Sequence, residues 1–348
     1  MIPASGYAVE SATAPLAPFR FTRRAVGPRD VLIHIRYCGI CHSDLHQARN
    51  EWGGSIYPMV PGHEITGAVL EVGRAVTAFT VGDPVGVGCM VDTCRTCPAC
   101  RSGDEPYCEA HPTWTYNSYE RDGVTPTYGG YSDRIVVDER YVLRIPPALP
   151  LDRAAPLLCA GITTYSPLLQ WGIGAGHRLA VVGLGGLGHM AVQLGAARGA
   201  AVTVLSRSEA KRPDALRLGA TDFVCTAGDL EPVHRTFDFI LDTVSAPHAI
   251  DSLLECLKTD GTLILVGAPD KPLAVGAMPL IMRRRRLAGS LIGGIEETQA
   301  MLDFCAAKGV AADIEVIPIQ RLNTAYERML QADVRYRFVI DLASLAED

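Results

Sequence analysis

Residues 179–195, "LAVVGLGGLGHMAVQLG", decide the fold of this chain. An apolar run is followed by a glycine-rich turn and a helix-compatible segment, which predicts a buried strand, a tight turn and a helix. Gly183, Gly185 and Gly188, with Gly186 and Leu187 between them, have the spacing G-x-G-x-x-G. In this setting the spacing lets the backbone approach a pyrophosphate at the helix N-terminus, so we expect a dinucleotide-binding loop. An ordinary glycine turn is the alternative.

The residues around this stretch predict an α/β fold with two kinds of domain. From about 156 to 290, apolar strands such as "AVTVLS", "FDFILDT" and "GTLILVGA" alternate with helical stretches, which is typical of a doubly wound parallel sheet with helices on both faces. Residues 1–155 instead contain short β-type runs such as "VLIHI" and "DRIVV" between Gly- and Pro-rich turns, which indicates a β-rich domain. We expect residues 291–348 to rejoin this first domain.

Composition excludes several classes of function. The 348 residues are 48% hydrophobic with a formal net charge of -6, which argues against a nucleic-acid binder, although Arg283 to Arg286 form a local basic run. We expect that run to be a solvated or salt-bridged edge. Neither a leader sequence nor a membrane span is predicted. Eleven cysteines without a secretory signal indicate a reducing compartment, so we expect a cytoplasmic protein.

The segment at the end of the predicted strand "AVTVLS" indicates which dinucleotide is bound. An acidic residue about 20 residues after the glycine loop would bind a ribose 2'-hydroxyl and repel a 2'-phosphate. The chain instead reads "SRSEAKR" at 206–212, where cations and hydroxyls could hold a phosphate. The sequence therefore predicts NADP(H) in preference to NAD(H), with contacts from Ser206, Arg207, Ser208, Lys211 and Arg212. Which of the three cations binds the phosphate is left open, and Glu209 favours the alternative that these are ordinary surface residues.

Residues 94–108, "CRTCPACRSGDEPYC", predict a structural metal site. The spacing resembles the start of an iron–sulfur run, but the fourth thiol comes too late and is followed by Glu109 and not by proline. Four thiolates without a histidine or carboxylate form a closed tetrahedral zinc set. A rubredoxin-like iron site and free thiols are the alternatives. The expected zinc ligands are Cys94, Cys97, Cys100 and Cys108.

A second set of ligands is suggested by the segments "CGICHSDLH", "PGHE" and "CAGIT". Cys41, His63 and Cys159 together have the composition of a catalytic zinc site, which keeps one position for water or substrate. They are far apart in sequence, and eleven cysteines and nine histidines allow many such triples. Spacing alone therefore leaves buried structural cysteines and a core histidine as the alternative.

The order of the motifs resembles a known enzyme family. "GICHSDLH", "VPGHEITGAVLEVG", "VGDPVGVG", the four-cysteine segment, "TYGGYSDRIVVDERYVLRIP", "CAGIT", "GLGGLG" and "GSLIGG" are similar to the motifs of zinc-dependent medium-chain alcohol dehydrogenases. Over essentially the whole chain they resemble the cinnamyl alcohol dehydrogenase branch, which includes NADPH-dependent aldehyde reductases. The resemblance implies a GroES-like catalytic domain, a Rossmann domain, a structural and a catalytic zinc, and a homodimer.

The resemblance also implies the reaction and its substrates. It implies hydride transfer between NADP(H) and primary alcohols or aldehydes, aromatic or medium aliphatic, in which zinc polarises the carbonyl oxygen. A polyol or secondary-alcohol dehydrogenase is the closest alternative. A non-catalytic zinc protein and a zinc-free quinone reductase are the others, although the quinone reductase would lack both ligand sets.

The resemblance also implies catalytic, metal-binding and ligand-binding roles for individual residues. Cys41, His63 and Cys159 match the catalytic zinc ligands, and Glu64 matches an acid that can replace the water ligand. Ser43 matches the hydroxyl that bonds the substrate oxygen, His46 the group that passes the proton to solvent, and Asp44 the orienting partner of His63. The implied cofactor contacts are His42 at a phosphate and Thr163 at the nicotinamide. The implied substrate contacts are Trp52, Trp114, Leu291 and Ile295.

Overall fold

The computed structural model describes residues 1–228, 230–269 and 271–347, and the chain divides into two compact units. Unit 1 comprises Met1–Cys159 and Gly293–Asp348, and unit 2 comprises Ala160–Ile292. The chain thus changes unit after Cys159 and after Ile292, where the sequence predicted changes after residues 155 and 290. None of the described helices is long and apolar enough to cross a bilayer.

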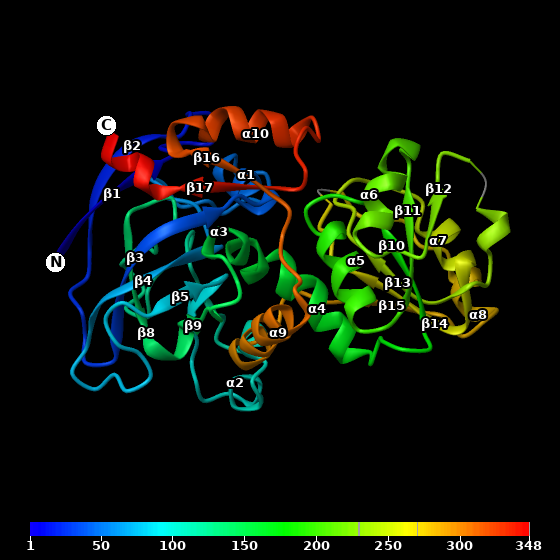
Figure 1. The fold of residues 1–348 in the computed structure, drawn as a ribbon, viewed down its shortest axis with the longest axis horizontal. Helices are drawn as coiled ribbons and strands as arrows, with labels where there is room; N and C mark the ends of the chain where they lie inside the picture. Colours follow the sequence, from blue (N-terminus) through cyan, green and yellow to red (C-terminus); the bar gives the residue numbers. More distant parts are fainter. Residues whose placement is uncertain (229, 270, 348) are drawn as a thin grey trace. The chain divides into compact units, whose positions relative to one another are not determined.

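Unit 2 is built on a six-stranded parallel sheet with helices against it (Figure 1). The strand order is β12-β11-β10-β13-β14-β15, and every neighbouring pair is parallel. The order reverses between β10 and β13, which is where such sheets bind ligands at the carboxyl ends of their strands. The strands are β10 Arg178–Val182, β11 Ala201–Ser206, β12 Asp222–Cys225, β13 Phe237–Asp242, β14 Leu257–Leu265 and β15 Arg286–Gly289. The helices are α4 Ala160–Gln170, α5 Gly188–Ala197, α6 Arg212–Arg217, α7 Ile250–Cys256 and α8 Ala277–Ile281.

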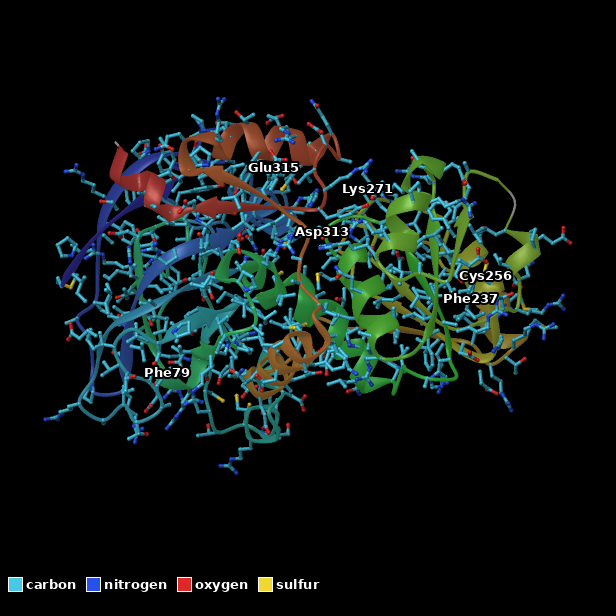
Figure 2. The ribbon with its side chains drawn as sticks, viewed as in Figure 1. Phe79, Phe237, Cys256, Lys271, Asp313 and Glu315 are labelled. Atoms are coloured by element: carbon cyan, nitrogen blue, oxygen red, sulfur yellow. The ribbon has the colours of Figure 1, made fainter. Side chains whose placement is uncertain are left out.

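The sheet of unit 2 is covered on both faces because its strands are apolar on both faces. Leu179, Ala180 and Val181 of β10 are all fully buried. Phe237 of β13 and Cys256 of α7, labelled in Figure 2, belong to one core cluster. Burying a side chain the size of phenylalanine stabilises the fold by about 1.5–3 kcal/mol. The predicted α/β fold of this part of the chain is confirmed.

The basic run before β15 is an internally bonded edge. Arg284 forms an ion pair with Asp260 at 2.7 Å. Arg285 is buried and donates to the carbonyl oxygens of Leu257 at 3.1 Å and Pro279 at 3.0 Å. These contacts explain why several arginines can follow one another here without forming a free basic patch.

Unit 1 is built around a mostly antiparallel seven-stranded sheet. Its order is β16-β17-β3-β4-β5-β9, and β8 also pairs with β3. Two small two-stranded sheets, β1-β2 and β6-β7, complete the strands. The strands are β1 Ile2–Ala8, β2 Ala17–Arg23, β3 Asp30–Gly39, β4 Ile65–Val72, β5 Pro84–Val87, β6 Met90–Asp92, β7 Thr113–Trp114, β8 Arg134–Asp138, β9 Leu143–Arg144, β16 Ile314–Pro318 and β17 Arg337–Asp341.

Helices connect these strands. The α-helices are α1 His42–Ala48, α2 Pro98–Ser102, α3 Leu151–Ala154, α9 Ile295–Lys308 and α10 Leu322–Leu330. The 3-10 helices of the described chain are η1 Glu105–Tyr107, η2 Glu139–Tyr141, η3 Ala155–Leu158, η4 Glu209–Lys211, η5 Glu231–Val233, η6 Ile319–Arg321 and η7 Leu342–Glu347. Of these, η4 and η5 belong to unit 2.

The late strand β17 lies between the edge strand β16 and β3 in the unit 1 sheet. It pairs antiparallel with the end of β3, where Val339 lies opposite Gly39 and Ile340 opposite Cys38. On its other side β3 pairs with the start of β4, where Cys38 lies opposite Ile65. The ends of three strands from distant parts of the chain therefore meet at one place.

Candidate functional site

The predicted catalytic-zinc residues converge in unit 1. One ligand atom from each of Cys41, His63, Glu64 and Cys159 lies within 4.8 Å of all the others, and all four residues are buried. The Sγ atoms of Cys41 and Cys159 are 3.9 Å apart, although 118 positions separate the residues. Two thiols, an imidazole and a carboxylate are a donor set that suits zinc.

Strand pairing brings two of these segments together. Cys41 follows β3 and caps the N-terminus of α1, while His63 and Glu64 immediately precede β4. The Gly39 N–H donates to the Glu64 carbonyl oxygen at 2.9 Å, which extends the β3–β4 pairing to the site. A β-carbon at Gly39 would lie 1.9 Å from Glu64 Oε2, so only glycine fits there.

Asp44 fixes the orientation of the His63 ring. Its Oδ1 lies 3.1 Å from His63 Nδ1, and its Oδ2 accepts from the Cys41 N–H at 2.8 Å. Because a carboxylate can only accept, Nδ1 carries the ring proton and Nε2 is left with a lone pair for a metal. The predicted pairing of Asp44 with His63 is thus present in the geometry.

Burial and charge tune the acidities of this cluster. The pKa of the Cys41 thiol lies well below its usual value, chiefly because of its hydrogen bond with Cys159 and despite burial. Burial raises the pKa of Glu64 to about 7, although the positive charge of Arg337 opposes the rise. Arg337 forms an ion pair with Glu64, and both side chains are almost completely buried. Glu64 Oε2 has no hydrogen-bond partner among the described residues, so this oxygen is available for a further contact.

Cys89 is a third thiol beside this cluster. The pKa of its thiol is lowered, chiefly by interaction with the side chain of Cys159. Its Sγ also lies 3.8 Å from the carbonyl oxygen of Leu158. Cys89 is partly exposed and lies beside the candidate ligand Cys159.

Helix α1 separates the other predicted catalytic side chains by face. Ser43 and His46 are three positions apart and so lie on one face, while Asp44 and Leu45 face the core. Ser43 Oγ lies 3.6 Å from Cys41 Sγ. His42 is exposed at the start of the helix, and its ring centroid lies 6.3 Å from that of His46.

His46 has two neighbours from the turn after α1. Its Nδ1 contacts the Glu51 carboxylate, and its ring stacks on Trp52 with centroids 4.9 Å apart. Trp52 is 41% exposed. The structure therefore places Trp52 against the predicted proton-transfer residue, and its predicted contact with substrate stays a prediction.

The four-cysteine segment forms a second cluster of ligand atoms. One sulfur from each of Cys94, Cys97, Cys100 and Cys108 lies within 4.8 Å of the others. Backbone N–H groups of the lobe point at the sulfurs, with the Cys97 N–H 3.3 Å from Cys94 Sγ. Such bonds lower the pKa of the Cys94 thiol to about 5. An all-thiolate set with N–H support suits a closed structural zinc site.

The predicted dinucleotide loop has the required shape. Gly183 follows β10 with a φ of 86°, a conformation that favours glycine. A β-carbon at Gly188 would lie 2.1 Å from the Gly183 carbonyl oxygen, so glycine is needed where α5 begins. Space is open beside Gly185, and Leu187 precedes the first turn of the helix. The loop therefore leaves room for a ligand at the N-terminus of α5.

The cationic side chains after β11 differ in the contacts that they already make. Arg212 pairs with Glu209 and lies over the Phe223 ring at 4.9 Å. Lys211 Nζ donates to the Leu184 carbonyl oxygen of the glycine loop at 2.8 Å. Arg207 is exposed, and within the described residues its guanidinium makes no hydrogen bond or ion pair. Ser206 is buried at the end of β11 and Ser208 is exposed.

The remaining predicted substrate and cofactor residues lie in separate elements. Trp114 is on β7 opposite Met90, and the Ile295 N–H at the start of α9 donates to Glu105 at 3.2 Å. Leu291 is 47% exposed in unit 2, and Thr163 is buried in α4. Their grouping around a substrate or a nicotinamide stays a prediction.

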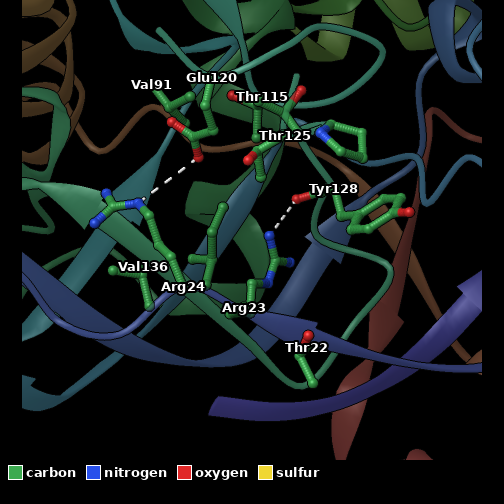
Figure 3. A pocket seen from close by; sticks show the side chains of 12 residues that line it. Thr22, Arg23, Arg24, Val91, Thr115, Glu120, Thr125, Tyr128 and Val136 are labelled. Carbon is green, nitrogen blue, oxygen red and sulfur yellow. Dashed lines mark hydrogen bonds and ion pairs between the residues drawn. The ribbon is translucent and has the colours of Figure 1, made fainter. Parts of the chain in front are cut away.

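A small cavity of unit 1 lies elsewhere. It has a volume of about 40 Å³ and is lined by side chains of β2, the segment 115–128 and β8 (Figure 3). Arg23 donates there to the Tyr128 carbonyl oxygen at 2.6 Å, and Arg24 approaches Glu120 at 3.7 Å. It contains none of the predicted site residues.

Comparison with known proteins decides the family. Residues 27–147 match the family model of the alcohol dehydrogenase GroES-like domain, and residues 186–307 match that of the zinc-binding dehydrogenase. The NADP-dependent alcohol dehydrogenase C 1 of Mycolicibacterium smegmatis is 57% identical over 344 residues, covering 98% of each chain. The chain belongs to the zinc-binding alcohol dehydrogenases.

Two further relatives place this alcohol dehydrogenase within its family. The aldehyde reductase YahK of Escherichia coli is 55% identical and covers 97% of each chain. The structure of a cinnamyl alcohol dehydrogenase from Sorghum bicolor superposes with a TM-score of 0.95 at 50% identity, covering 98% of each chain. The predicted family, fold class, enzyme class and cofactors, zinc and NADP(H), are confirmed.

Sequence reasoning missed several residues of the site in this alcohol dehydrogenase. Glu51 could have been found, because it follows His46 by five positions in the turn after a short helix. Arg337 carries no sequence signal, since 273 positions separate it from Glu64. It reaches the site only through the pairing of β17 with β3.

Proposed function

We propose that this chain reduces aldehydes to primary alcohols with NADPH, and catalyses the reverse oxidation, at the buried cluster of Cys41, His63 and Cys159. The observation that carries the proposal is the convergence of these ligands beside an oriented histidine and a polar helix face. Relatives named alcohol dehydrogenase and aldehyde reductase support the reaction class.

The ligand residues are prepared for a metal. The lowered pKa of Cys41 favours the thiolate form that binds a metal, and Asp44 leaves the His63 Nε2 lone pair free. Zinc, when bound, supplies a Lewis acid for the carbonyl oxygen, and NADPH supplies the hydride. We infer that Glu64 is an alternative oxygen ligand, and that its ion pair with Arg337 opposes its binding to the metal.

Ser43, His46 and Glu51 would move the proton. The Ser43 hydroxyl donates to the oxygen of the forming alcohol, and His46 replaces that proton. Glu51 accepts from Nδ1 of His46, so Nε2 is the nitrogen that exchanges protons with the substrate side. Because the Glu51 side chain is 38% exposed, it links this relay to solvent and stabilises the imidazolium.

Unit 2 would bind NADP(H). We infer that the pyrophosphate lies at the N-terminus of α5 over Gly185, where space is open. Arg207 is the best candidate for the 2'-phosphate, because Arg212 already has Glu209 and Phe223 as neighbours. The four-cysteine lobe would hold the structural zinc.

We further propose a homodimer joined through unit 2. β15 is the edge strand of the six-stranded sheet, so its outer backbone groups are unpaired within the described chain. Beside it Met278, Ile281 and Met282 are 60%, 67% and 70% exposed. An exposed edge next to exposed apolar side chains favours association with a second copy. In size-exclusion chromatography with light scattering, Ile281→Asp should convert a dimer to a monomer.

A reducing compartment suits the thiols. All eleven cysteines are free, and two clusters of them need thiolates to bind zinc. We therefore propose a cytoplasmic location.

Steady-state kinetics with metal analysis tests the proposal. We expect a chain with zinc at both clusters to oxidise NADPH in the presence of benzaldehyde or cinnamaldehyde. Faster turnover with NADH than with NADPH would overturn the cofactor assignment. A single zinc per chain, or activity unchanged by Cys41→Ser, would overturn the site.

A further inference from the structure

A buried group of tyrosines surrounds the carboxylate that orients His63. Tyr131 OH donates to Asp44 Oδ2 at 3.1 Å, and Tyr131 is 0% exposed. Behind it Tyr326 OH lies 3.5 Å from Tyr131 OH. Tyr131 precedes β8 and Tyr326 lies on α10, 195 positions later.

We propose that Tyr131 is a positioning residue for the zinc ligand His63, acting through Asp44, and that Tyr326 on α10 supports Tyr131. This inference rests on the proposed catalytic zinc. A chain of contacts leads from the Tyr326 hydroxyl on α10 to the Tyr131 hydroxyl, then to the Asp44 carboxylate and then to the His63 ring.

The Asp44 carboxylate needs the tyrosine donor. Asp44 is 0% exposed, so each lone pair of the carboxylate must be satisfied by the protein. One oxygen accepts from His63 Nδ1 at 3.1 Å and from the Gly62 N–H at 3.2 Å. The other accepts from the Cys41 N–H at 2.8 Å and from Tyr131. Removing the Tyr131 hydroxyl therefore leaves the second oxygen with one fewer donor, and the carboxylate that orients His63 is held less firmly.

The hydroxyl of Tyr131 has a fixed place and a fixed direction. Its ring packs on the backbone just before His63, where a β-carbon on Gly62 would lie 2.7 Å from Tyr131 Cδ1. Its N–H donates to the Pro61 carbonyl oxygen at 3.0 Å. Burial, with the Asp44 charge, raises the pKa values of both Tyr131 and Tyr326 well above normal, so both hydroxyls stay protonated.

Distances rank the two tyrosines. The 3.1 Å bond to a buried charge is charge-assisted, whereas a 3.5 Å contact between hydroxyls is at the limit of a hydrogen bond. Loss of a partner that bonds directly to a ligand histidine weakens metal binding about 10–100-fold. Tyr131 acts one residue further out, so we expect Tyr131→Phe to accelerate zinc release about 3–10-fold, and Tyr326→Phe less.

Zinc release from the metal-loaded full chain into a chelator tests the proposal. The two clusters should give two kinetic phases, and Asp44→Asn identifies the phase of the Cys41 cluster by accelerating it. Tyr131→Phe should accelerate that phase alone. The matched control is Tyr141→Phe, which removes a buried hydroxyl bonded at 2.6 Å to Thr93, whose own hydroxyl lies 3.2 Å from Cys100 Sγ of the lobe. It should leave the Cys41-cluster phase unchanged.

The double variant separates positioning from general destabilisation. If Tyr326 acts through Tyr131, then Tyr131→Phe with Tyr326→Phe should release zinc no faster than Tyr131→Phe alone. Release within twofold of wild type in Tyr131→Phe, or multiplied effects in the double variant, would overturn the proposal. Should Tyr131→Phe fail to fold, Tyr326→Phe decides: its effect must disappear in the Asp44→Asn background. Failure of the proposed function would look different, because no zinc phase would respond to Asp44→Asn.

Discussion

Arg337 forms an ion pair with Glu64 of the ligand cluster, although 273 positions separate the two residues in the chain. Both side chains are at most 4% exposed. A buried pair of this kind contributes little net stability, but removing one partner leaves a charge without compensation.

Arg337→Leu should therefore destabilise unit 1 by about 3–5 kcal/mol. Urea unfolding followed by circular dichroism measures the change. Adding Glu64→Gln should recover much of the loss, because the Glu64 charge that Arg337 compensated is then removed as well. Equal stability of the wild type and the Arg337→Leu variant would contradict the importance of the pair.

Cys97→Ser should remove one zinc and unfold the lobe of residues 94–108. Structural zinc contributes about 10 kcal/mol or more of apparent binding energy, which is coupled to local folding. Metal analysis should show zinc remaining only at the Cys41 cluster. Cys225→Ser is the matched control, since Cys225 is a partly exposed thiol of unit 2 outside both clusters. Full zinc content in Cys97→Ser would argue that the lobe is not a metal site.

Arg207→Ser should raise the KM for NADPH about 10–100-fold, because a hydrogen bond to a charged group contributes about 1.5–3 kcal/mol. The KM for NADH should change little. Arg212→Ser serves as the comparison, since that guanidinium is already engaged with Glu209 and Phe223. A larger NADPH defect in Arg212→Ser than in Arg207→Ser would transfer the phosphate contact to Arg212.

Glu51→Gln should lower the turnover number for aldehyde reduction about tenfold, and His46→Gln should lower it about a hundredfold or more. The amide keeps the size of Glu51 but cannot stabilise an imidazolium by charge. The double variant should be no slower than His46→Gln alone, since Glu51 acts through His46. Independent, multiplied losses would separate Glu51 from the relay.

The pair of His248 and Asp242 should make the stability of unit 2 depend on pH. His248 Nε2 lies 2.7 Å from Asp242 Oδ2, and this bond raises the pKa of His248 above its usual value. A raised histidine pKa adds stability that is complete below the unfolded pKa of about 6.5 and is lost as pH rises through the folded pKa.

His248→Gln should therefore cost about 1 kcal/mol or less at pH 6, and almost nothing at pH 9, because the pair is partly exposed to solvent. Denaturant unfolding at both pH values measures the difference. A larger cost at pH 9 than at pH 6 would reverse the sign of the argument.

The sequence was most informative where local chemistry decides the structure. The apolar strand and glycines of 179–195 require a strand, turn and helix wherever they occur, and the six-stranded parallel sheet confirms the fold they predicted. The four cysteines of the lobe lie within one short segment, so their closeness could be anticipated from spacing. Cys41, His63 and Cys159 were found only because each sits in a motif that resembles the family.

Contacts that depend on strand register could not be predicted. Arg337 reaches Glu64 because Val339 pairs with Gly39, and no pattern in the sequence indicates that register. Tyr131 likewise meets Asp44, and Tyr326 meets Tyr131, only after β8 and α10 are packed. The choice between Arg207 and Arg212 depends on which guanidinium Glu209 captures, which is a property of the folded chain.

Because β17 is close to the C-terminus, the ligand cluster of unit 1 can be completed only late in synthesis. Unit 2 is a continuous segment that can fold as soon as residue 292 has been made, since domains generally fold as units during synthesis. Cys41, His63 and Cys159 are made early, but their supporting residues Tyr326 and Arg337 are available only after they have emerged from the ribosome. A nascent chain stalled before that point would contain a folded unit 2 and a ligand cluster without its supporting residues.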